Sequence, residues 1–333
     1  MSAPYAALHE TVNGPGDARP TALQILNDNN LEGKLTDKVA LVTGCSSGIG
    51  IETARVLKIA GMRVFAAVRN LEKGKKALGS TLEPGRCELV ELDLDSLSSV
   101  RKCAAEILSK TDRLNILVNN AGIMACPEGR TPDGFERQFG TNHLAHFLLF
   151  NLLKDLMLKS ATPDFGSRVV NVSSSAHRYS PIVFDNLNLE GIYDPEKSYG
   201  QSKTANIYMA NEIERRYGAQ DLHAFSLNPG AVAGTGLGAN VSDEMKAKWA
   251  TWGPEVINHF KSIEQGAATQ IWAAIDKGLE GKGGLYLNDC GVANPVLENS
   301  SDLEPGYAAW AYNEEAEKRL WKVSMELVGL EDE

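Results

Sequence analysis

Short apolar segments alternate along the chain with longer segments that carry apolar residues at helical spacing. The apolar segments are rich in Val, Leu and Ile and are bounded by polar or turn-forming residues, as buried strands are. The pattern predicts strands at residues 39–44, 63–69, 87–94, 114–122, 168–175, 223–230 and 284–289. It predicts helices between them, at residues 51–62, 98–110, 134–158, 199–218 and 264–278.

This alternation predicts the fold class. Strands without a polar face, separated by helices, are typical of a parallel sheet that is covered on both sides. We therefore expect a single α/β domain over residues 37–333, built on a doubly wound (Rossmann-type) parallel sheet of about seven strands with helices on both faces. Residues 1–36 are an N-terminal extension in this prediction: a polar arm up to residue 20 with little structure of its own, then a short outer helix.

Composition narrows the class of partner. The 333 residues are 43% hydrophobic and 23% charged, with a formal charge of −10. This acidic balance argues against binding to nucleic acid or to an anionic membrane surface, and no apolar run approaches the roughly 20 residues of a membrane span. The five cysteines are widely spaced, as in proteins that keep their thiols reduced. With no recognisable targeting segment, we expect a cytoplasmic protein whose partner is a small molecule.

A glycine-rich segment, TGCSSGIG at residues 43–50, lies between the first predicted strand and the first predicted helix. In this position a turn can present backbone N–H groups at a helix N-terminus to a pyrophosphate. A tight strand-to-helix turn without a ligand also uses glycine, so both interpretations are open. The place of the segment directly after the first strand favours a dinucleotide.

Tyr199 and Lys203 stand four residues apart in YGQSK, where a helical pattern begins. At that spacing the two side chains share one face of a helix. An ammonium group favours phenolate over phenol and therefore lowers the pKa of a tyrosine, which is about 10 without such a neighbour. Such a tyrosine can transfer protons near neutral pH, although the same spacing also occurs by chance on solvated helices.

Three motifs in one order, T-G-x-x-x-G-I-G, N-N-A-G and Y-x-x-x-K, resemble those of the short-chain dehydrogenase/reductases, over about residues 36–290. The segments NHLAHFLLFNLL, NVSSSAH and SYGQSKTAN resemble the retinol-dehydrogenase-like branch of that family. The resemblance implies an oxidoreductase that transfers a hydride between a nicotinamide cofactor and an alcohol or carbonyl compound, without a metal ion.

The resemblance also implies the catalytic residues, since Asn142, Ser174, Tyr199 and Lys203 match the catalytic tetrad of the family. Tyr199 would be the general acid or base, its pKa lowered by Lys203 and by the oxidised nicotinamide. Ser174 would donate to the substrate oxygen, because the second serine of the family's S-S pair is the usual catalytic one. Lys203 would also hold the nicotinamide ribose, and Asn142 would orient a water that relays protons.

The expected cofactor is NADP(H). After the second strand an NAD enzyme places an acid for the ribose 2′-hydroxyl, whereas an arginine accommodates a 2′-phosphate. Here Arg69 ends that strand and no carboxylate follows before Glu72, although Arg69 could also merely cap the strand in solvent. The cofactor-binding residues implied by the resemblance are Gly44, Ser46, Ser47, Gly48, Ile49 and Gly50 at the phosphates, Arg69 at the 2′-phosphate, Asp93, Leu94 and Asn120 around the adenosine, and Tyr199, Lys203, Val232 and Thr235 at the nicotinamide end.

The segment after the Pro-Gly pair of NPGAVAGTGL departs from the family pattern. Gly234 takes the place of the usual threonine and Thr235 comes one residue later, so Val232 is the firmer neighbour of the nicotinamide ring. Residues around 231–262 are expected to form a lid over the substrate. Four lid residues suggest a bulky, largely apolar substrate, retinoid- or terpenoid-like, although such residues more often serve ordinary packing. They are Met245, Trp249, Trp252 and Phe260.

Other reactive side chains have weaker cases. His143 and His146 have the spacing of two metal ligands, but no third ligand has matching local spacing, and a packed helix is the simpler interpretation. His177 lies near Ser174 in sequence, as in a Ser–His hydrolase, but the G-x-S-x-G elbow of such enzymes is absent. The resemblance to the retinol-dehydrogenase-like branch implies instead that His177 belongs to the wall of the substrate site. Cys126 has no basic neighbour and is expected to be inert.

Alternatives for function and assembly stay open. A redox-sensing protein could hold the dinucleotide without turnover, although such proteins typically lack the tyrosine or the lysine. An epimerase or dehydratase could use a transient hydride, although the extended family members that do so generally differ in the glycine-rich turn. The apolar helix at residues 143–158 could form a helix-pair interface in a homo-oligomer, or it could be buried inside one subunit.

Overall fold

The computed structural model describes residues 4–297, 300–301 and 303–332. Its centre is one eight-stranded sheet with the strand order β3-β2-β1-β4-β5-β6-β7-β8, and only the β7–β8 pair is antiparallel. The order reverses between β1 and β4, and open α/β sheets bind ligands beside such a reversal, at the carboxyl ends of the strands. The strands are β1 Val39–Thr43, β2 Arg63–Val68, β3 Cys87–Glu91, β4 Ile116–Asn119, β5 Ser167–Val172, β6 Leu222–Asn228, β7 Leu285–Asn288 and β8 Gly291–Val292.

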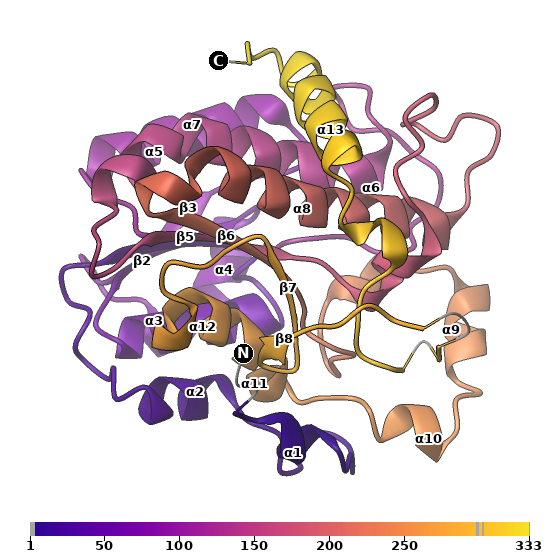
Figure 1. The fold of residues 1–333 in the computed structure, drawn as a ribbon, viewed down its shortest axis with the longest axis horizontal. Helices are drawn as coiled ribbons and strands as arrows, with labels where there is room; N and C mark the ends of the chain where they lie inside the picture. The colour runs from indigo at the N-terminus through magenta and orange to yellow at the C-terminus, as the bar shows by residue number, and fades with distance from the viewer. Residues whose placement is uncertain (1–3, 298–299, 302, 333) are drawn as a thin grey trace.

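Helices cover both faces of the sheet (Figure 1). On one face α5, α7 and α8 pack against the strands with α13 outside them, and on the other lie α3, α11 and α12 with α2 outside. Successive side chains of a strand point to opposite faces, so Leu41 of β1 belongs to one core and Val42 to the other. The helices are α1 Ala6–His9, α2 Ala22–Asp28, α3 Ile49–Ile59, α4 Leu71–Leu78, α5 Leu97–Lys110, α6 Arg137–Phe139, α7 Ala145–Ser160, α8 Pro195–Tyr217, α9 Asp243–Trp249, α10 Pro254–Ile257, α11 Ile263–Gly266, α12 Ala268–Ile275 and α13 Glu314–Leu327.

All seven predicted strands are present, and the doubly wound parallel sheet is confirmed. An eighth strand, β8, was not predicted and pairs with β7. Asp289 and Cys290 connect the two strands with φ angles of 53° and 54°. Two left-handed residues suit a two-residue hairpin connection. Because neither residue is Gly or Asn, the usual sequence signal for such a turn is missing.

The long helix expected at residues 134–158 is present over residues 137–160, but it is not regular throughout. The segment forms three successive pieces: α6, a π-helical turn over Gly140–Leu144, and α7. Glu136 is buried and starts the first piece, because its carboxylate accepts hydrogen bonds from two backbone N–H groups of α6. π turns inside helices are frequent at functional sites, and this one carries Asn142.

The C-terminal helix α13 covers an apolar face of α7. The Trp321 ring meets Phe147 and Phe150 edge-on, with centroid distances of 4.8 and 6.3 Å. Ser324 Oγ lies 2.9 Å from His143 Nε2, at the start of the same face. The sequence left open whether this helix forms an interface between subunits or is buried inside one subunit. The structure shows that this face of α7 is buried inside one subunit. Assembly into a homo-oligomer through other surfaces stays a prediction.

The N-terminal arm (residues 4–20) carries one helical turn, α1, which is as little structure of its own as the sequence predicts. The arm is nevertheless fixed on the domain. The side chain of Tyr5 donates to Asp28 of α2, and Arg19 is only 3% exposed. The short outer helix expected within residues 20–33 is α2, which packs on α3 and α12.

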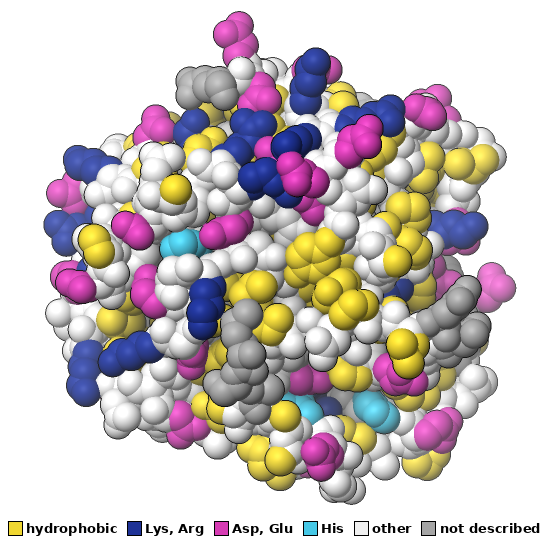
Figure 2. Space-filling model, viewed as in Figure 1, with side chains coloured by type: hydrophobic (Ala, Val, Ile, Leu, Met, Phe, Trp, Pro, Cys, Tyr) yellow, Lys and Arg dark blue, Asp and Glu magenta, His cyan; other side chains and the backbone are white. Residues whose placement is uncertain are grey.

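The surface carries charges of both signs. On the face in Figure 2, Lys and Arg side chains are interspersed with Asp and Glu, so neither sign dominates that face. Among the described residues several charges are paired, as Arg63 is with Glu88. Within the described residues, every helix is too short or too polar to cross a bilayer.

Candidate active site

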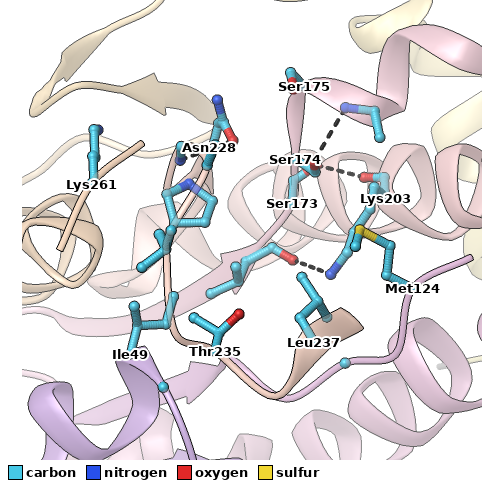
Figure 3. A pocket seen from close by; sticks show the side chains of 18 of the residues that line it. Ile49, Met124, Ser173, Ser174, Ser175, Lys203, Asn228, Thr235, Leu237 and Lys261 are labelled. Carbon is cyan, nitrogen blue, oxygen red and sulfur yellow. Dashed lines mark hydrogen bonds between the residues drawn. The ribbon is translucent and has the colours of Figure 1, made fainter. Parts of the chain in front are cut away.

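A cavity of about 1380 Å³ runs along the carboxyl ends of the strands. Its walls come from the glycine-rich turn after β1, the ends of β2 to β7, the first turns of α8, the N-terminal arm, and the segment around residues 231–262 that is predicted to be a lid. Figure 3 shows its central part, with Ser174 and Lys203 on one side and Lys261 on the other. Of the catalytic and cofactor-binding residues predicted from the sequence, all line the cavity except Asn142 and Gly50.

The turn after β1 depends on glycine. Gly48 has φ 63° and ψ −146°, a combination that residues with a Cβ rarely adopt, and it begins α3. A Cβ on Gly50 would lie 2.5 Å from Asn120 Nδ2, so only glycine allows α3 to start this close to the end of β4. The backbone N–H groups of Ser46, Ser47 and Gly48 have no acceptor among the described residues. Because they lie at the N-terminus of α3, the turn fits the pyrophosphate of a dinucleotide.

Thr43 and His146 hold this turn in place, a role that the sequence reasoning missed. The Thr43 hydroxyl accepts from the N–H groups of Asn120 and Ala121 at 3.0 and 2.9 Å. It lies 2.9 Å from His146 Nε2, and His146 Nδ1 lies 3.0 Å from the carbonyl oxygen of Asn142. With its proton on Nδ1, a neutral imidazole thus joins the glycine-rich turn, the NNAG segment and the π turn. In the sequence, the only indication of this role was the threonine directly before the glycine-rich turn.

Ser174 faces the cavity at the end of β5. Its Oγ accepts from the N–H of Ala176 at 3.2 Å and is hydrogen-bonded to the hydroxyl of Tyr199. The hydroxyl of Ser173 instead donates to the carbonyl oxygen of Lys203 at 2.8 Å. The geometry therefore supports Ser174, and not Ser173, as the partner of Tyr199.

His177 is not in the wall of the cavity, contrary to the prediction. Its side chain is fully buried, with Nδ1 2.7 Å from the carbonyl oxygen of Ser174 and Nε2 accepting from the N–H of Ala308 at 3.0 Å. Burial lowers the pKa of His177 to about 4, so the imidazole is neutral near pH 7. His177 therefore links the segment around Ala308 to the backbone of Ser174, outside the cavity wall.

Tyr199 and Lys203 both face the cavity from α8, as their spacing predicts. Lys203 Nζ lies 5.4 Å from the centroid of the Tyr199 ring and donates to the carbonyl oxygen of Val172 at 3.0 Å. The predicted lowering of the Tyr199 pKa is wrong for the protein alone, because burial raises that pKa and the hydrogen bond with Ser174 only partly offsets the rise. Burial also lowers the pKa of Lys203 to about 7. Sequence spacing brings the pair together but does not reveal how much water both groups lose.

Asn142 supports the site from within the π turn. Its Oδ1 accepts from the N–H of Ile123, and its Nδ2 donates to the carbonyl oxygen of Ile123 and to Ser202 Oγ, each at 2.9 Å. The side chain thus fixes both the segment after NNAG and the helix that carries Tyr199. Its role in orienting a water stays a prediction.

Two basic side chains line the cavity beside the end of β2, where the sequence suggested one. Arg69 is exposed just after the strand, and Lys73 follows in the first turn of α4. Asn70 caps that helix by accepting from the N–H of Lys73 at 2.8 Å. Asp93 and Leu94 line the cavity after β3. These positions agree with the proposed adenosine and 2′-phosphate contacts, which stay predictions.

The first part of the lid closes on the glycine-rich turn. A Cβ on Gly48 would lie 3.1 Å from Thr235 Cγ2, and one on Gly236 would lie 2.9 Å from Ser47 Oγ. Thr235 therefore lies beside the glycine-rich turn. Val232 lines the cavity and packs closely on Gly266 of α11. The contacts of Thr235 and Val232 with a cofactor stay predictions.

The family model described as short chain dehydrogenase matches residues 38–246. The chain belongs to the short-chain dehydrogenase/reductase family. Short-chain dehydrogenase/reductase prx1 of Penicillium roqueforti is 54% identical over 320 residues, which cover 96% of this chain and 93% of that protein. Retinol dehydrogenase 11 of Homo sapiens is 38% identical over 301 residues, which cover 89% of this chain and 87% of that protein. The retinol-dehydrogenase-like branch indicated by the sequence is thereby confirmed.

Solved structures share the fold of this short-chain dehydrogenase/reductase. An uncharacterized protein from Mycobacterium paratuberculosis is 32% identical and has a TM-score of 0.68, with 90% of this chain and 96% of that chain covered. The angucycline C-6 ketoreductase LanV, solved with bound NADP, is 26% identical and has a TM-score of 0.59, with 78% of this chain and 96% of LanV covered.

The paired histidines of this short-chain dehydrogenase/reductase are core residues. His143 packs beside Phe147 with a centroid distance of 5.8 Å, and burial lowers its pKa to about 3. Burial lowers the pKa of His146 to about 4. Nowhere in the described part of the chain do three His, Cys, Asp or Glu side chains meet as a metal site would require. Cys126 is buried, and burial raises the pKa of its thiol, which agrees with the inert role expected.

His143 should make the folded state sensitive to acid. Its pKa is about 3 in the folded chain and about 6.5 when unfolded, so below pH 6.5 the unfolded chain binds a proton that the folded chain does not. His143→Gln should therefore reduce the loss of unfolding free energy between pH 7 and pH 5 by about 2 kcal/mol. Urea unfolding of both proteins at the two pH values measures this difference. Equal losses would contradict the burial of a neutral His143.

Proposed function

We propose that this short-chain dehydrogenase/reductase is an NADP(H)-dependent enzyme acting on a bulky, largely apolar alcohol or ketone. The observation that carries the proposal is the meeting of Ser174, Tyr199 and Lys203 in one cavity with the unpaired N–H groups of the glycine-rich turn. At about 1380 Å³ the cavity is larger than the roughly 300–1,000 Å³ of a site for one drug-sized ligand, as a joint site for a dinucleotide and a substrate should be.

The side chains around the reacting oxygen have separate roles. The bound nicotinamide supplies or accepts the hydride. Tyr199 gives its proton to the substrate oxygen in reduction and takes it back in oxidation. Ser174, hydrogen-bonded to Tyr199, donates to the same oxygen as negative charge develops there. Lys203 has a pKa of about 7, so through the water expected beside Asn142 it can replace the proton that Tyr199 loses.

The preference for NADP(H) rests on charge at the end of β2. Arg69 and Lys73 line the cavity there, and no carboxylate of residues 67–73 does. Two cations suit a 2′-phosphate, whereas a 2′-hydroxyl would lack the acidic acceptor that NAD enzymes place at this point. The NADP bound to LanV, a relative with the same fold, supports this preference.

The lid supports the choice of a bulky substrate. Trp249 and Trp252 stack with ring centroids 5.6 Å apart, and Phe260 lies 6.0 Å from Trp252. All three rings and Met245 line the cavity and are partly exposed to it. A short keto acid would leave this aromatic wall unfilled, whereas a polycyclic, terpenoid or retinoid-like carbonyl compound would bury apolar surface against it.

A panel of ketones and alcohols of graded size, followed by NADPH absorbance, tests the proposed function. kcat/KM should rise at least about tenfold from short keto acids to bulky ketones, because burying one more large apolar group contributes about 1.5–3 kcal/mol. Trp252→Ala should remove much of this gain without changing NADPH affinity. Ile257→Ala is the matched control, because Ile257 lies on the lid, is 51% exposed and does not line the cavity. The substrate class is wrong if short keto acids are the best substrates or if Trp252→Ala keeps the full discrimination.

A further inference from the structure

The N-terminal arm contributes to the same cavity as the catalytic residues. Ala6, His9, Glu10 and Val12 line its wall. The arm also lies against the lid, since Gly14 N–H donates to a lid carbonyl oxygen, that of residue 258, at 2.9 Å. In Figure 1, α1 of the arm and α10 of the lid lie along the same lower edge of the molecule. A segment outside the three family motifs thus forms part of the cavity wall.

Arg19 joins the arm to the last residues of the lid. Its guanidinium donates to the carbonyl oxygens of Asn258, His259 and Phe260, at 3.3, 2.9 and 2.7 Å. Its Nε donates to Asp17 Oδ1 at 2.8 Å, and the Arg19 side chain is only 2% exposed. A buried guanidinium needs such acceptors, because an unpaired buried charge is strongly destabilising. One arginine therefore holds three consecutive carbonyl groups where the lid returns to the domain.

The arm is anchored on a helix of the main domain. Gln265 of α11 donates from Nε2 to the carbonyl oxygens of Asp17 and Arg19, each at 3.1 Å. Its Oε1 accepts from the N–H of Gly16 at 2.9 Å. α11 in turn packs on α3, the helix that follows the glycine-rich turn. The arm therefore connects the lid, through α11, to α3, the helix that begins at the glycine-rich turn.

The rest of the lid has few anchors of its own. Its two ends are joined, since Val232 and Lys261 form a parallel bridge and Lys261 Nζ pairs with Asp289 at 2.6 Å. Between the ends, the described lid residues form one 3-10 turn and two helices of seven and four residues. Helices this short are marginal without packing partners. The position of the aromatic wall therefore depends on contacts at the lid ends, where Arg19 acts.

We infer that the N-terminal arm is a substrate-specificity element of this enzyme: Val12 and its neighbours form one wall of the substrate site, and Arg19 is a positioning residue for the lid. This inference rests on the proposed function, because the substrate is the ligand that the arm and the lid would enclose. In this inference the arm restricts the size of the carbonyl compound that can bind, and it takes no part in hydride transfer.

Val12→Trp tests the wall directly. The larger ring should occupy substrate space and raise KM for the bulkiest ketone at least about fivefold, with KM for a small ketone, kcat and NADPH affinity unchanged. Thr11→Trp is the matched control, because Thr11 is exposed and does not line the cavity. Equal KM values for the bulky ketone in Val12→Trp, Thr11→Trp and the parent protein would overturn the inference.

Arg19→Met tests the positioning role, since methionine keeps much of the aliphatic volume and removes the donors. It should raise KM for bulky ketones about five- to tenfold with kcat changed less than about twofold. Trypsin should also cleave the lid faster after Lys246, which is exposed on α9. A purely structural arginine would lower the unfolding midpoint but leave KM and lid cleavage unchanged, and that result would overturn the role given to Arg19.

The two proposals can fail separately. If the parent protein turns over no carbonyl compound with NADPH, yet Arg19→Met exposes the lid to trypsin, the proposed function fails and the link between arm and lid stands. If bulky ketones are reduced and neither arm variant changes KM, the proposed function stands and the inference is overturned. If Arg19→Met does not fold, Val12→Trp still tests whether the arm forms a wall of the substrate site.

Discussion

Tyr199→Phe should lower kcat on the best substrate by about 10²- to 10⁴-fold, which is the usual contribution of a general acid–base group. The reason is the position of the hydroxyl: it faces the cavity, is hydrogen-bonded to Ser174 and stands on the helix that carries Lys203. NADPH affinity should stay nearly unchanged, because the substitution alters neither the glycine-rich turn nor the end of β2. Steady-state kinetics and NADPH titration of the purified variant measure the two quantities.

Tyr208→Phe is the matched control. Tyr208 lies on the same helix, and its hydroxyl donates to the carbonyl oxygen of Trp310, away from the cavity. This variant loses the same atom and should keep its kcat. If Tyr199→Phe retains half of the parent kcat, Tyr199 is not the proton donor.

Arg69→Asp should weaken NADPH binding about ten- to a hundredfold and shift the preference toward NADH, because a hydrogen bond to a charged group contributes about 1.5–3 kcal/mol. The new carboxylate also repels a 2′-phosphate and accepts from a 2′-hydroxyl. Lys73 lines the same end of the cavity, so some NADPH affinity should remain until it is replaced as well. Titration of the variant with NADPH and NADH measures the shift.

Arg86→Asp makes the same charge change at an exposed residue that does not line the cavity, and it should leave both affinities unaltered. Equal NADPH binding by Arg69→Asp and Arg86→Asp would reject the place given to the 2′-phosphate.

Structural features that depend on residues close together in the sequence could be predicted. The strands follow from short apolar runs, and the turn at Gly48 and Gly50 follows from glycines between a strand and a helix. The pairing of Tyr199 with Lys203 follows from helical spacing. In contrast, β8 was missed because its connection uses Asp289 and Cys290 in left-handed conformations without a glycine.

Features that depend on distant residues were not predictable. The pKa of Tyr199 depends on burial, which the helix spacing does not report, so the predicted lowering of that pKa was wrong for the protein alone. His177 was placed in the cavity wall because it follows Ser174, whereas its partner Ala308 lies far along the chain. The arm was expected only to have little structure of its own, and its sequence did not indicate that Arg19 meets carbonyl groups about 240 residues away. No local pattern signals such a contact.

The most direct test of the central claim, hydride transfer by this site, is to follow a label from the cofactor into the product. With NADPH deuterated at both C4 positions and a bulky ketone as substrate, the account predicts an alcohol that carries one deuterium on its carbinol carbon. Its hydroxyl proton should come from water through Tyr199, and Tyr199→Phe should form almost none of the labelled alcohol. An unlabelled alcohol, or no alcohol from any ketone while NADPH binds normally, would contradict the account.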